Sequence, residues 1–344
     1  MTNPRSGQAE ATAVALGGIG AVGAWALSFP APFLTGPALL VSVMAVLGVP
    51  VALPNVVRNA VFVVIGMTMG AGVTPETLAT AAQWPFSILT LFAALIAIML
   101  ICTRILARMF QYDPQTAVLA SAPGHLSFVL GLSTETKADI PVLSIVQTMR
   151  VLTLTLAVPA ILAVTNADLE PRFSLEGVPM AAVGLTIVAA LSVALGFGFT
   201  KLRVPAAFLI GGLFVSAGFH VTETVPGVVP QWLSIPAFAL MGVLIGTRFN
   251  GISWAKLRQA LGASGVVTGV ALLVSGAAAL VVAQFIAVEP AHLLIAFAPG
   301  GLETMAAMGI MLGANPAFIA AHHVLRILFL TVMIPLMLNR TTRS

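Results

Sequence analysis

The sequence predicts an all-α membrane protein with two inverted-topology repeats, about ten transmembrane helices and two re-entrant helical hairpins. Composition is the first observation: 59% of the 344 residues are apolar and 8% are charged, whereas a soluble domain carries roughly 25% charged residues. The mean hydropathy is +1.07, and no single soluble core hides that much apolar surface, so most of it must face lipid. These values exclude a soluble enzyme, a disulfide scaffold and a disordered chain.

Apolar runs that are long enough, or nearly long enough, to cross a bilayer account for the ten predicted spans. They cover residues 11–29, 33–48, 54–72, 84–107, 141–163, 179–199, 205–220, 229–247, 261–285 and 316–338. Two further runs, 115–133 and 291–313, each contain a Pro-Gly break near the middle. The predicted organisation is a cytoplasmic N-terminal tail (1–10), a first membrane repeat (11–164), a charged linker (165–178) and a second membrane repeat (179–340).

An internal duplication is the second observation. A shift of 176 residues places Ala122-Pro123-Gly124 on Ala298-Pro299-Gly300 and Arg150 on Arg326. From 120 to 160 this match is ungapped, with 11 identities in 41 positions. Shared apolar composition does not align Pro, Gly and Arg in register, so the two halves derive from a duplication.

Loop charge is the third observation, and it predicts the orientation. If all twelve apolar runs cross, seven Lys and Arg residues lie inside and six outside. If the two broken runs instead enter and leave on one side, the halves are inverted, and twelve lie inside with only Arg172 outside. The positive-inside rule favours the second arrangement. It predicts a multi-pass protein of the bacterial inner membrane with both termini in the cytoplasm.

The two Pro-Gly breaks are the first candidate functional elements. Backbone exposed to lipid costs several kcal/mol per unpaired group, so a break survives only inside protein or beside a water-filled cavity. Free N–H groups at the start of the following half-helix would form a partly positive cradle for an anionic group. The candidate substrate-binding residues at the tips are Pro123, Gly124, His125 and Ser127 in the first copy and Pro299, Gly300, Gly301, Glu303 and Thr304 in the second.

A buried arginine follows each break. Arg150 lies nine residues after Pro141 and Arg326 lies ten after Pro316, so at about 1.5 Å per residue both should lie roughly 13–15 Å deep. A lone arginine at that depth costs at least ~2.5 kcal/mol and needs a partner. Two interpretations stay open: the arginines balance a substrate carboxylate or Glu303, or they bind hairpin-end carbonyls and hold the fold.

Polar side chains accompany both arginines on the same helices. Gln147 precedes Arg150 by three residues, and His323 and His322 precede Arg326 by three and four, which places them on or beside the arginine's face. We therefore add Gln147, Arg150, His323 and Arg326 to the candidate substrate site. His322 and His323 point about 100° apart on a helix and seldom share an ion, so we expect no metal and no cofactor.

Glu303 is the one carboxylate that we place at membrane depth, and its counterpart in the first copy is Ser127. A carboxylate there suits ion coupling, and we assign that role to Glu303 with His322. The alternative is a permanent ion pair with Arg326. The repeated motifs Gly66-x-x-x-Gly70 and Gly242-x-x-x-Gly246 predict close packing against a hairpin or a neighbouring helix, with subunit dimerisation as the second interpretation.

The two elements 122–126 and 298–303, each followed by a buried arginine in 150–152 or 323–326, resemble the AbrB family of membrane proteins. This resemblance covers essentially residues 11–340, although His125 and Ser127 depart from the Pro-Gly-Gly-Leu-Glu pattern. The family carries the label of an ammonia monooxygenase and, by its name, a link to regulation of gene expression. The resemblance implies kinship with inverted-repeat cation/proton antiporters and anion transporters that use elevator-like motion, and it is compatible with a homodimer.

The leading hypothesis is a secondary transporter that moves a small anionic metabolite, a carboxylate or an amino-acid-like molecule, by alternating access. Its partners would be that substrate, a coupling ion (H⁺ or Na⁺) and the lipid bilayer, with no nucleic acid. The first alternative, a metal-dependent membrane monooxygenase, is disfavoured because the five histidines and the mostly loop-borne acids offer no converging ligands; we therefore predict no enzyme. The second alternative is a ligand-sensing membrane regulator without transport.

Overall fold

The computed structural model describes residues 4–124, 126–134, 136–165 and 177–341, and these residues form helices without a strand. The first half contains α1 (Pro4–Ala26), α2 (Pro32–Val46), α3 (Asn55–Ala71), α4 (Pro75–Ala79), the 3₁₀ helix η1 (Thr80–Gln83), α5 (Trp84–Met109), α6 (Pro114–Ser121), α7 (Leu126–Ser133) and α8 (Ile140–Val164). The second half contains α9 (Ala182–Lys201), α10 (Ala207–Val221), α11 (Gln231–Thr247), α12 (Trp254–Ala283), α13 (Pro290–Phe297), α14 (Leu302–Met311) and α15 (Pro316–Thr341).

The helix pattern of the first half recurs in the second. Helices α6, α7 and α8 begin 176 residues before α13, α14 and α15, and α2 begins 175 residues before α10. The backbone repeats as well: Ala31 and Ala206, which precede α2 and α10, have φ values of 52° and 50°. Non-glycine residues rarely adopt such angles, so their recurrence at matched positions reflects the duplication seen in the sequence.

Within the described ranges, six helices are long and apolar enough to cross a membrane, and they come in three matched pairs: α1 and α9, α5 and α12, α8 and α15. The remaining predicted spans, α2, α3, α10 and α11, have 15–17 residues and are therefore about 22–26 Å long. Helix α1 begins at Pro4, so residues 4–10 of the predicted tail extend the first helix. Proline suits this position because the first helical N–H has no partner to lose.

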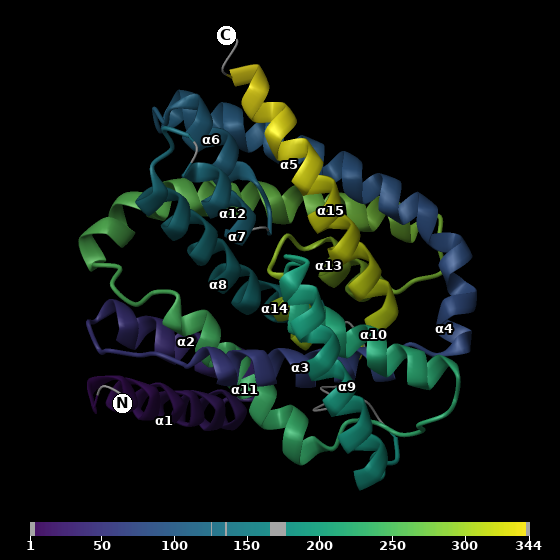
Figure 1. The fold of residues 1–344 in the computed structure, drawn as a ribbon. Coiled ribbons are helices and arrows are strands. Elements are labelled where there is room, and N and C mark those ends of the chain that lie inside the picture. Colours follow the sequence, from purple (N-terminus) through teal and green to yellow (C-terminus); the bar gives the residue numbers. More distant parts are fainter. Residues whose placement is uncertain (1–3, 125, 135, 166–176, 342–344) are drawn as a thin grey trace.

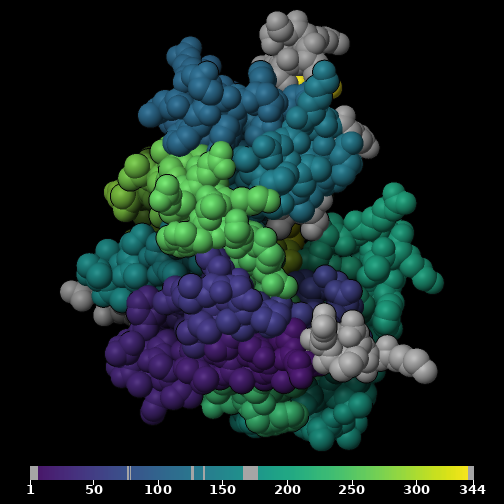
Figure 2. Space-filling view, turned by 90° about the vertical axis from the view of Figure 1, so that its left-hand side faces the viewer, coloured from purple at the N-terminus to yellow at the C-terminus, as the bar shows by residue number. Residues whose placement is uncertain are grey.

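The helices form two layers, which Figure 1 shows one above the other. The lower layer comprises α1–α3 and α9–α11; within it α2 packs against α11 and α3 against α10. The hairpin layer comprises α5–α8 and α12–α15; within it α12 packs against α5, α8 and α13. Figure 2 shows the same division from the side, with purple N-terminal helices in the lower half, above green and teal segments, and blue segments near the top. Each half of the chain therefore contributes to both layers.

Glycines join the two halves within the lower layer. A methyl group on Gly66 or Gly70 of α3 would collide with carbonyl oxygens of α10, and one on Gly242 of α11 would collide with a carbonyl oxygen of α2. A methyl group on Gly246 would lie 2.5 Å from the Cβ of Val41 on α2. The prediction of close packing against a neighbouring helix is confirmed, and in both cases that neighbour is the second helix of the other half.

Candidate functional site

The chain reverses direction at the first Pro-Gly break. The backbone N–H of Asp139 donates to Thr116 Oγ1 at 2.9 Å, and that of Lys137 donates to Gln115 Oε1 at 3.0 Å. These bonds join the start of α6 to the residues that follow α7, so the two half-helices form a hairpin, here called the first hairpin (residues 114–133). Tyr112 lies at the same end of the first hairpin as these bonds. Burial raises the pKa of Tyr112, and the nearby Asp139 carboxylate raises it further.

The second break also reverses the chain. A methyl group on Gly309 of α14 would lie 3.8 Å from the side chain of Ile295 on α13. A continuous helix would hold these residues about 21 Å apart along its axis, so α13 and α14 lie side by side. They form the second hairpin (residues 290–311).

The tips of the two hairpins touch. Gly124 has a φ of +88°, and a methyl group there would lie 2.8 Å from the carbonyl oxygen of Gly300 and 3.2 Å from the guanidinium carbon of Arg326. Both the backbone angle and the close approach require glycine at this position. The Pro-Gly breaks that the sequence singled out therefore meet at one place in the fold.

Arg150 and Gln147 of α8 bind the end of the first half-helix. Arg150 Nη1 donates to the carbonyl oxygen of Ala122 at 3.0 Å, and its Nη2 donates to Gln147 Oε1 at 2.6 Å. Gln147 Nε2 donates to the carbonyl oxygens of Leu119 and Ala122 at 3.1 and 2.9 Å. These carbonyls lie at the C-terminal end of α6, where that of Leu119 also accepts the N–H of Ala122 at 3.4 Å, and a cation at this end complements the helix dipole.

Arg326 and His323 of α15 repeat the arrangement in the second hairpin. Arg326 Nη1 donates to the carbonyl oxygen of Ala298 and its Nη2 to that of Gly300, both at 2.7 Å. His323 Nε2 lies 3.2 Å from the carbonyl oxygen of Ile295. Arg150 is 1% exposed and Arg326 is fully buried, so charge-assisted bonds to carbonyls offset their desolvation. Of the two interpretations of the arginines, binding to hairpin-end carbonyls is seen directly.

Unsatisfied polar atoms gather around the tips. Among the described residues, buried side-chain atoms without a hydrogen-bond partner include Arg150 Nε, Arg326 Nε, Thr304 Oγ1 and His323 Nδ1. Buried polar groups nearly always have partners in native structures. All four atoms belong to the second hairpin or to the side chains of α8 and α15 that bind the two hairpins.

A cavity of about 110 Å³ lies beside the tips, at the boundary of the two layers. From the hairpin layer it is lined by Gly124, Gln147, Arg150, Val151, Gly301, Leu302, Glu303 and Ile327; from the lower layer by Pro205, Ala206 and Arg248. Five predicted site residues thus come together around one space: Gly124, Gln147, Arg150, Gly301 and Glu303. We call this space the tip cavity.

The other predicted residues lie around this cavity rather than on its wall. Pro123, Pro299, Gly300, Thr304, His323 and Arg326 belong to the two tips or their arginine caps and are not among the lining residues. His125 and the side chain of Ser127 lie outside the described part of the chain. His322 is buried against α5, where its Nε2 lies 2.8 Å from Ser87 Oγ and its Nδ1 lies 2.8 Å from the carbonyl oxygen of Phe318.

Glu303 lies in the first turn of α14, with Gly301 as the uncapped N-cap. Within the described part of the chain its carboxylate has no ion pair within 4.0 Å, whereas both terminal nitrogens of Arg326 are bound to carbonyls. Arg326 does interact electrostatically with Glu303 and Arg150. The structure therefore shows a half-buried carboxylate near two arginines and not a Glu303–Arg326 salt bridge.

Of the six lining residues that sequence reasoning did not assign to the site, Arg248 is the charged one. It was counted as a loop charge that reports orientation. It forms the C-cap of α11 and is half-buried. The duplication held a signal for it: at a shift of 176 its counterpart is Gly72, so the two halves differ in charge at a matched position. Among the described residues no group of three His, Cys, Asp or Glu side chains could hold a metal ion.

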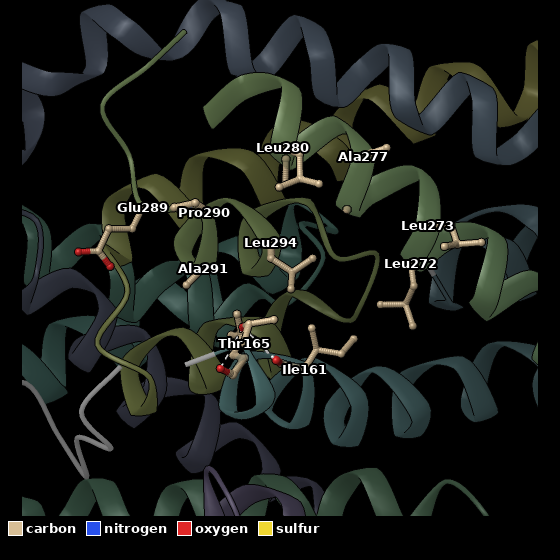
Figure 3. Close-up of a pocket in the computed structure, with 13 residues that line it drawn as sticks. Ile161, Thr165, Leu272, Leu273, Ala277, Leu280, Glu289, Pro290, Ala291 and Leu294 are labelled. Atoms are coloured by element: carbon tan, nitrogen blue, oxygen red, sulfur yellow. Dashed lines mark hydrogen bonds between the residues drawn. The ribbon is translucent and has the colours of Figure 1, made fainter. Parts of the chain in front are cut away.

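A larger cavity of about 900 Å³ lies apart from the tips, between the end of α8, α12 and the start of α13. Figure 3 shows its leucines and Ile161 around the space, with Glu289 at one end. None of the predicted site residues lines it. We call it the apolar cavity, and because it lacks converging polar groups, it is not the candidate site.

Together these features define a class: a membrane-type helical protein with a duplicated half, in which each half carries a broken hairpin capped by an arginine. The model of the AbrB family, described as "Transition state regulatory protein AbrB", matches residues 33–341. The chain belongs to the AbrB family, as the resemblance of its motifs indicated.

Two relatives match across both halves. The "Uncharacterized protein YhjN" of Bacillus subtilis (strain 168) is 25% identical over 289 residues, which cover 79% of this chain and 75% of the relative. The "Putative regulator AbrB" of Escherichia coli (strain K12) is 23% identical over 309 residues, 89% of this chain and 88% of the relative. The regulatory function in that name is a statement about the E. coli protein.

Proposed function

We propose that the protein is a secondary transporter that moves a small anionic metabolite, a carboxylate or an amino-acid-like molecule, across the bacterial inner membrane by alternating access. The observation that carries the proposal is the tip cavity, where both hairpin tips, Arg150 and Glu303 meet residues of the lower layer. Binding sites of transporters with internal repeats lie where broken helices meet near the membrane midplane. The 110 Å³ space between two Pro-Gly breaks fits that description.

The electrostatics of the tip cavity favour an anion. Ala206, the N-cap of α10, and Gly301, the N-cap of α14, both line the cavity, and neither helix has a side-chain cap. Free N–H groups and the positive end of the helix dipole therefore face this region. Arg150 and Arg248 add two positive charges to the same wall.

The proposed topology has ten spanning helices in two inverted halves. The six long helices and the four helices of 15–17 residues would supply these spans, and the two hairpins would enter from opposite sides. Loop charge assigns both chain termini, the loop before α10 and the end of α11 to the cytoplasmic side. Since Pro205 and Arg248 line the tip cavity, the cavity would lie toward the cytoplasm in this conformation.

The two-layer architecture supports an elevator-like movement. The lower layer is joined by close glycine contacts between α3 and α10 and between α2 and α11, whereas both hairpins and both arginine caps belong to the hairpin layer. A substrate in the tip cavity would contact both layers, so displacement of one layer against the other would change the side to which it is exposed. Glu303, which has no ion pair among the described residues, is the group proposed to carry the coupling ion.

Uptake by purified protein in liposomes tests the proposal. We expect labelled small carboxylates or amino acids to accumulate under an inward proton or sodium gradient, and we expect Glu303→Gln to abolish accumulation while retaining exchange. Glu289→Gln is a matched control, because Glu289 is exposed and does not line the tip cavity. Binding without counterflow would overturn transport in favour of a ligand sensor, and stoichiometric copper or iron in active protein would overturn it in favour of an oxygenase.

A further inference from the structure

We infer that the tip cavity selects a singly charged anion of few non-hydrogen atoms, and that Arg248 determines this selectivity. The inference rests on the proposed function and narrows its substrate class. It depends on the charges that line the cavity, the cavity volume and one difference between the two halves.

Among the described residues, three ionisable side chains line the tip cavity: Arg150, Arg248 and Glu303. Arg326 lies behind Gly124 rather than on the wall, and both of its terminal nitrogens are bound to carbonyl oxygens. With Glu303 as a carboxylate, their net charge is one positive unit, which a single negative charge neutralises. A doubly charged ligand would leave an excess negative charge beside Glu303, and a ligand without net charge would leave the positive unit unpaired. Uncompensated charge is costly in a site of low dielectric constant.

The two arginines differ in what they can still bind. Arg150 uses Nη1 and Nη2 on Ala122 and Gln147, which leaves its buried Nε without a partner. Arg248 makes no side-chain hydrogen bond or ion pair with the described residues, so its whole guanidinium is available for a ligand. A guanidinium binds carboxylates through two parallel hydrogen bonds, and Arg248 is therefore the principal anion-binding side chain.

The volume of the tip cavity limits the ligand to a small molecule. It measures about 110 Å³, whereas cavities for drug-sized ligands measure about 300–1,000 Å³. This volume favours a small ligand such as a two- or three-carbon carboxylate.

The other half of the molecule lacks the same set of charges. The counterparts of Arg248 and Glu303 are Gly72 and Ser127. A methyl group on Gly72 would lie 2.5 Å from Pro316, so that position is filled by packing at the start of α15. Arg248 comes from the lower layer, and Glu303 comes from the hairpin layer, so a bound anion would connect the two layers on one side of the molecule only.

Three probes with the same number of non-hydrogen atoms separate charge from size: pyruvate (singly charged), oxalate (doubly charged) and alanine (no net charge). Binding to purified protein is measured by calorimetry at constant ionic strength. We expect pyruvate to bind at least about tenfold more tightly than either competitor, which corresponds to one lost charge-assisted hydrogen bond. Arg248→Ala should weaken pyruvate binding by about tenfold, and Arg248→Lys by less.

Glu303→Gln is the variant that sharpens the test. It raises the net charge of the cavity wall by one unit, so it should reverse the preference from pyruvate to oxalate. Arg258→Ala, an exposed arginine on α12, is the matched control and should leave all three affinities unchanged. Each variant is compared at equal thermal stability, so that a folding defect is not read as a binding defect.

The inference is overturned if the wild-type protein prefers oxalate or alanine, if it binds none of the three, or if Arg248→Ala leaves pyruvate binding unchanged. Its failure is distinguishable from failure of the proposed function. Charge-selective binding without flux in liposomes would defeat transport and leave the site assignment intact. Flux of alanine with no dependence on Arg248 would support transport and defeat the assignment.

Discussion

Both hairpins reverse the chain and are capped by an arginine. They differ at the base, which is the end opposite the Pro-Gly tip. In the first hairpin, the Asp113 side chain accepts the N–H groups of Gln115 and Thr116 at 3.0 Å. Thr116 and Gln115 accept the N–H groups of Asp139 and Lys137 in turn. Polar contacts thus join both ends of this hairpin to each other.

The second hairpin has lost the same contacts. The positions that match Gln115, Thr116 and Lys137 hold Ala291, His292 and Gly313. Glu289 does not cap α13 with its side chain; it is 66% exposed and lies 3.6 Å from His292. The apolar cavity borders this base (Figure 3). The duplication supplied two similar hairpins. The first has a base closed by polar contacts, whereas the second has a carboxylate, Glu303, at its tip and a base that borders the apolar cavity.

The largest effect is expected from removing the arginine caps. Arg326→Ala should destabilise the protein by about 2–5 kcal/mol, because the buried carbonyls of Ala298 and Gly300 lose their side-chain donors. Arg150→Ala should cost less, because Gln147 still donates to Ala122. Thermal unfolding in detergent measures both variants, and equal losses would contradict the difference between the two caps.

The next effect concerns the contact between the tips. Gly124→Ala should cost about 1–3 kcal/mol, because it combines a positive φ with a collision against the Gly300 carbonyl. Gly300→Ala is the matched variant and should cost less, since the obstructing group there is the flexible side chain of Met305. Unfolding midpoints test the order, and a larger loss for Gly300→Ala would refute it.

A smaller effect should follow from loosening the first base. Thr116→Val removes the acceptor of the Asp139 N–H and should cost about 1 kcal/mol. Hydrogen exchange should rise in residues 114–139 and stay unchanged in the second hairpin. Thr134→Val, at an exposed position, serves as the control, and equal exchange in the two variants would show that the Thr116 bond does not hold the base.

The smallest effect on stability is expected in the apolar cavity. Gly276 lines it and has open space around it, so Gly276→Leu should be neutral or stabilise α12 by up to about 1 kcal/mol. If the second hairpin moves into this cavity during transport, the same variant should lower flux without changing binding. Gly269→Leu, also in open space on α12 but outside the cavity lining, should leave flux unchanged.

Strong, repeated signals in the sequence predicted much of this structure. The Pro-Gly pairs and arginines, repeated at a fixed shift, located both hairpins, because a broken helix in a membrane protein has few other solutions. Binding of the hairpin-end carbonyls was one of the two interpretations that the sequence left open for the arginines. Arg248 could not be found in this way. Its position depends on the contact between the end of α11 and the hairpin tips, a long-range feature that no local spacing encodes.

Glu303 likewise combines one feature that the sequence predicted with one that it did not. Its place at the second hairpin tip followed from its position after the second break, but the choice between a salt bridge and a free carboxylate depended on how Arg326 distributes its donors. Arg326 donates one terminal nitrogen to the carbonyl oxygen of Ala298 and the other to that of Gly300, both just after α13. Local spacing brought the residues together, and backbone hydrogen bonding decided which of them bind each other.

The glycine contacts of α2 and α3 also bear on how the protein is made. Their partners α11 and α10 lie in the second half, so both helices leave the ribosome well before the surfaces that cover them. The first half on its own would have these narrow backbone faces uncovered, and it should be degraded in cells when expressed alone. Coexpression of the two halves as separate chains should restore a stable complex, because the close contacts that join them are noncovalent.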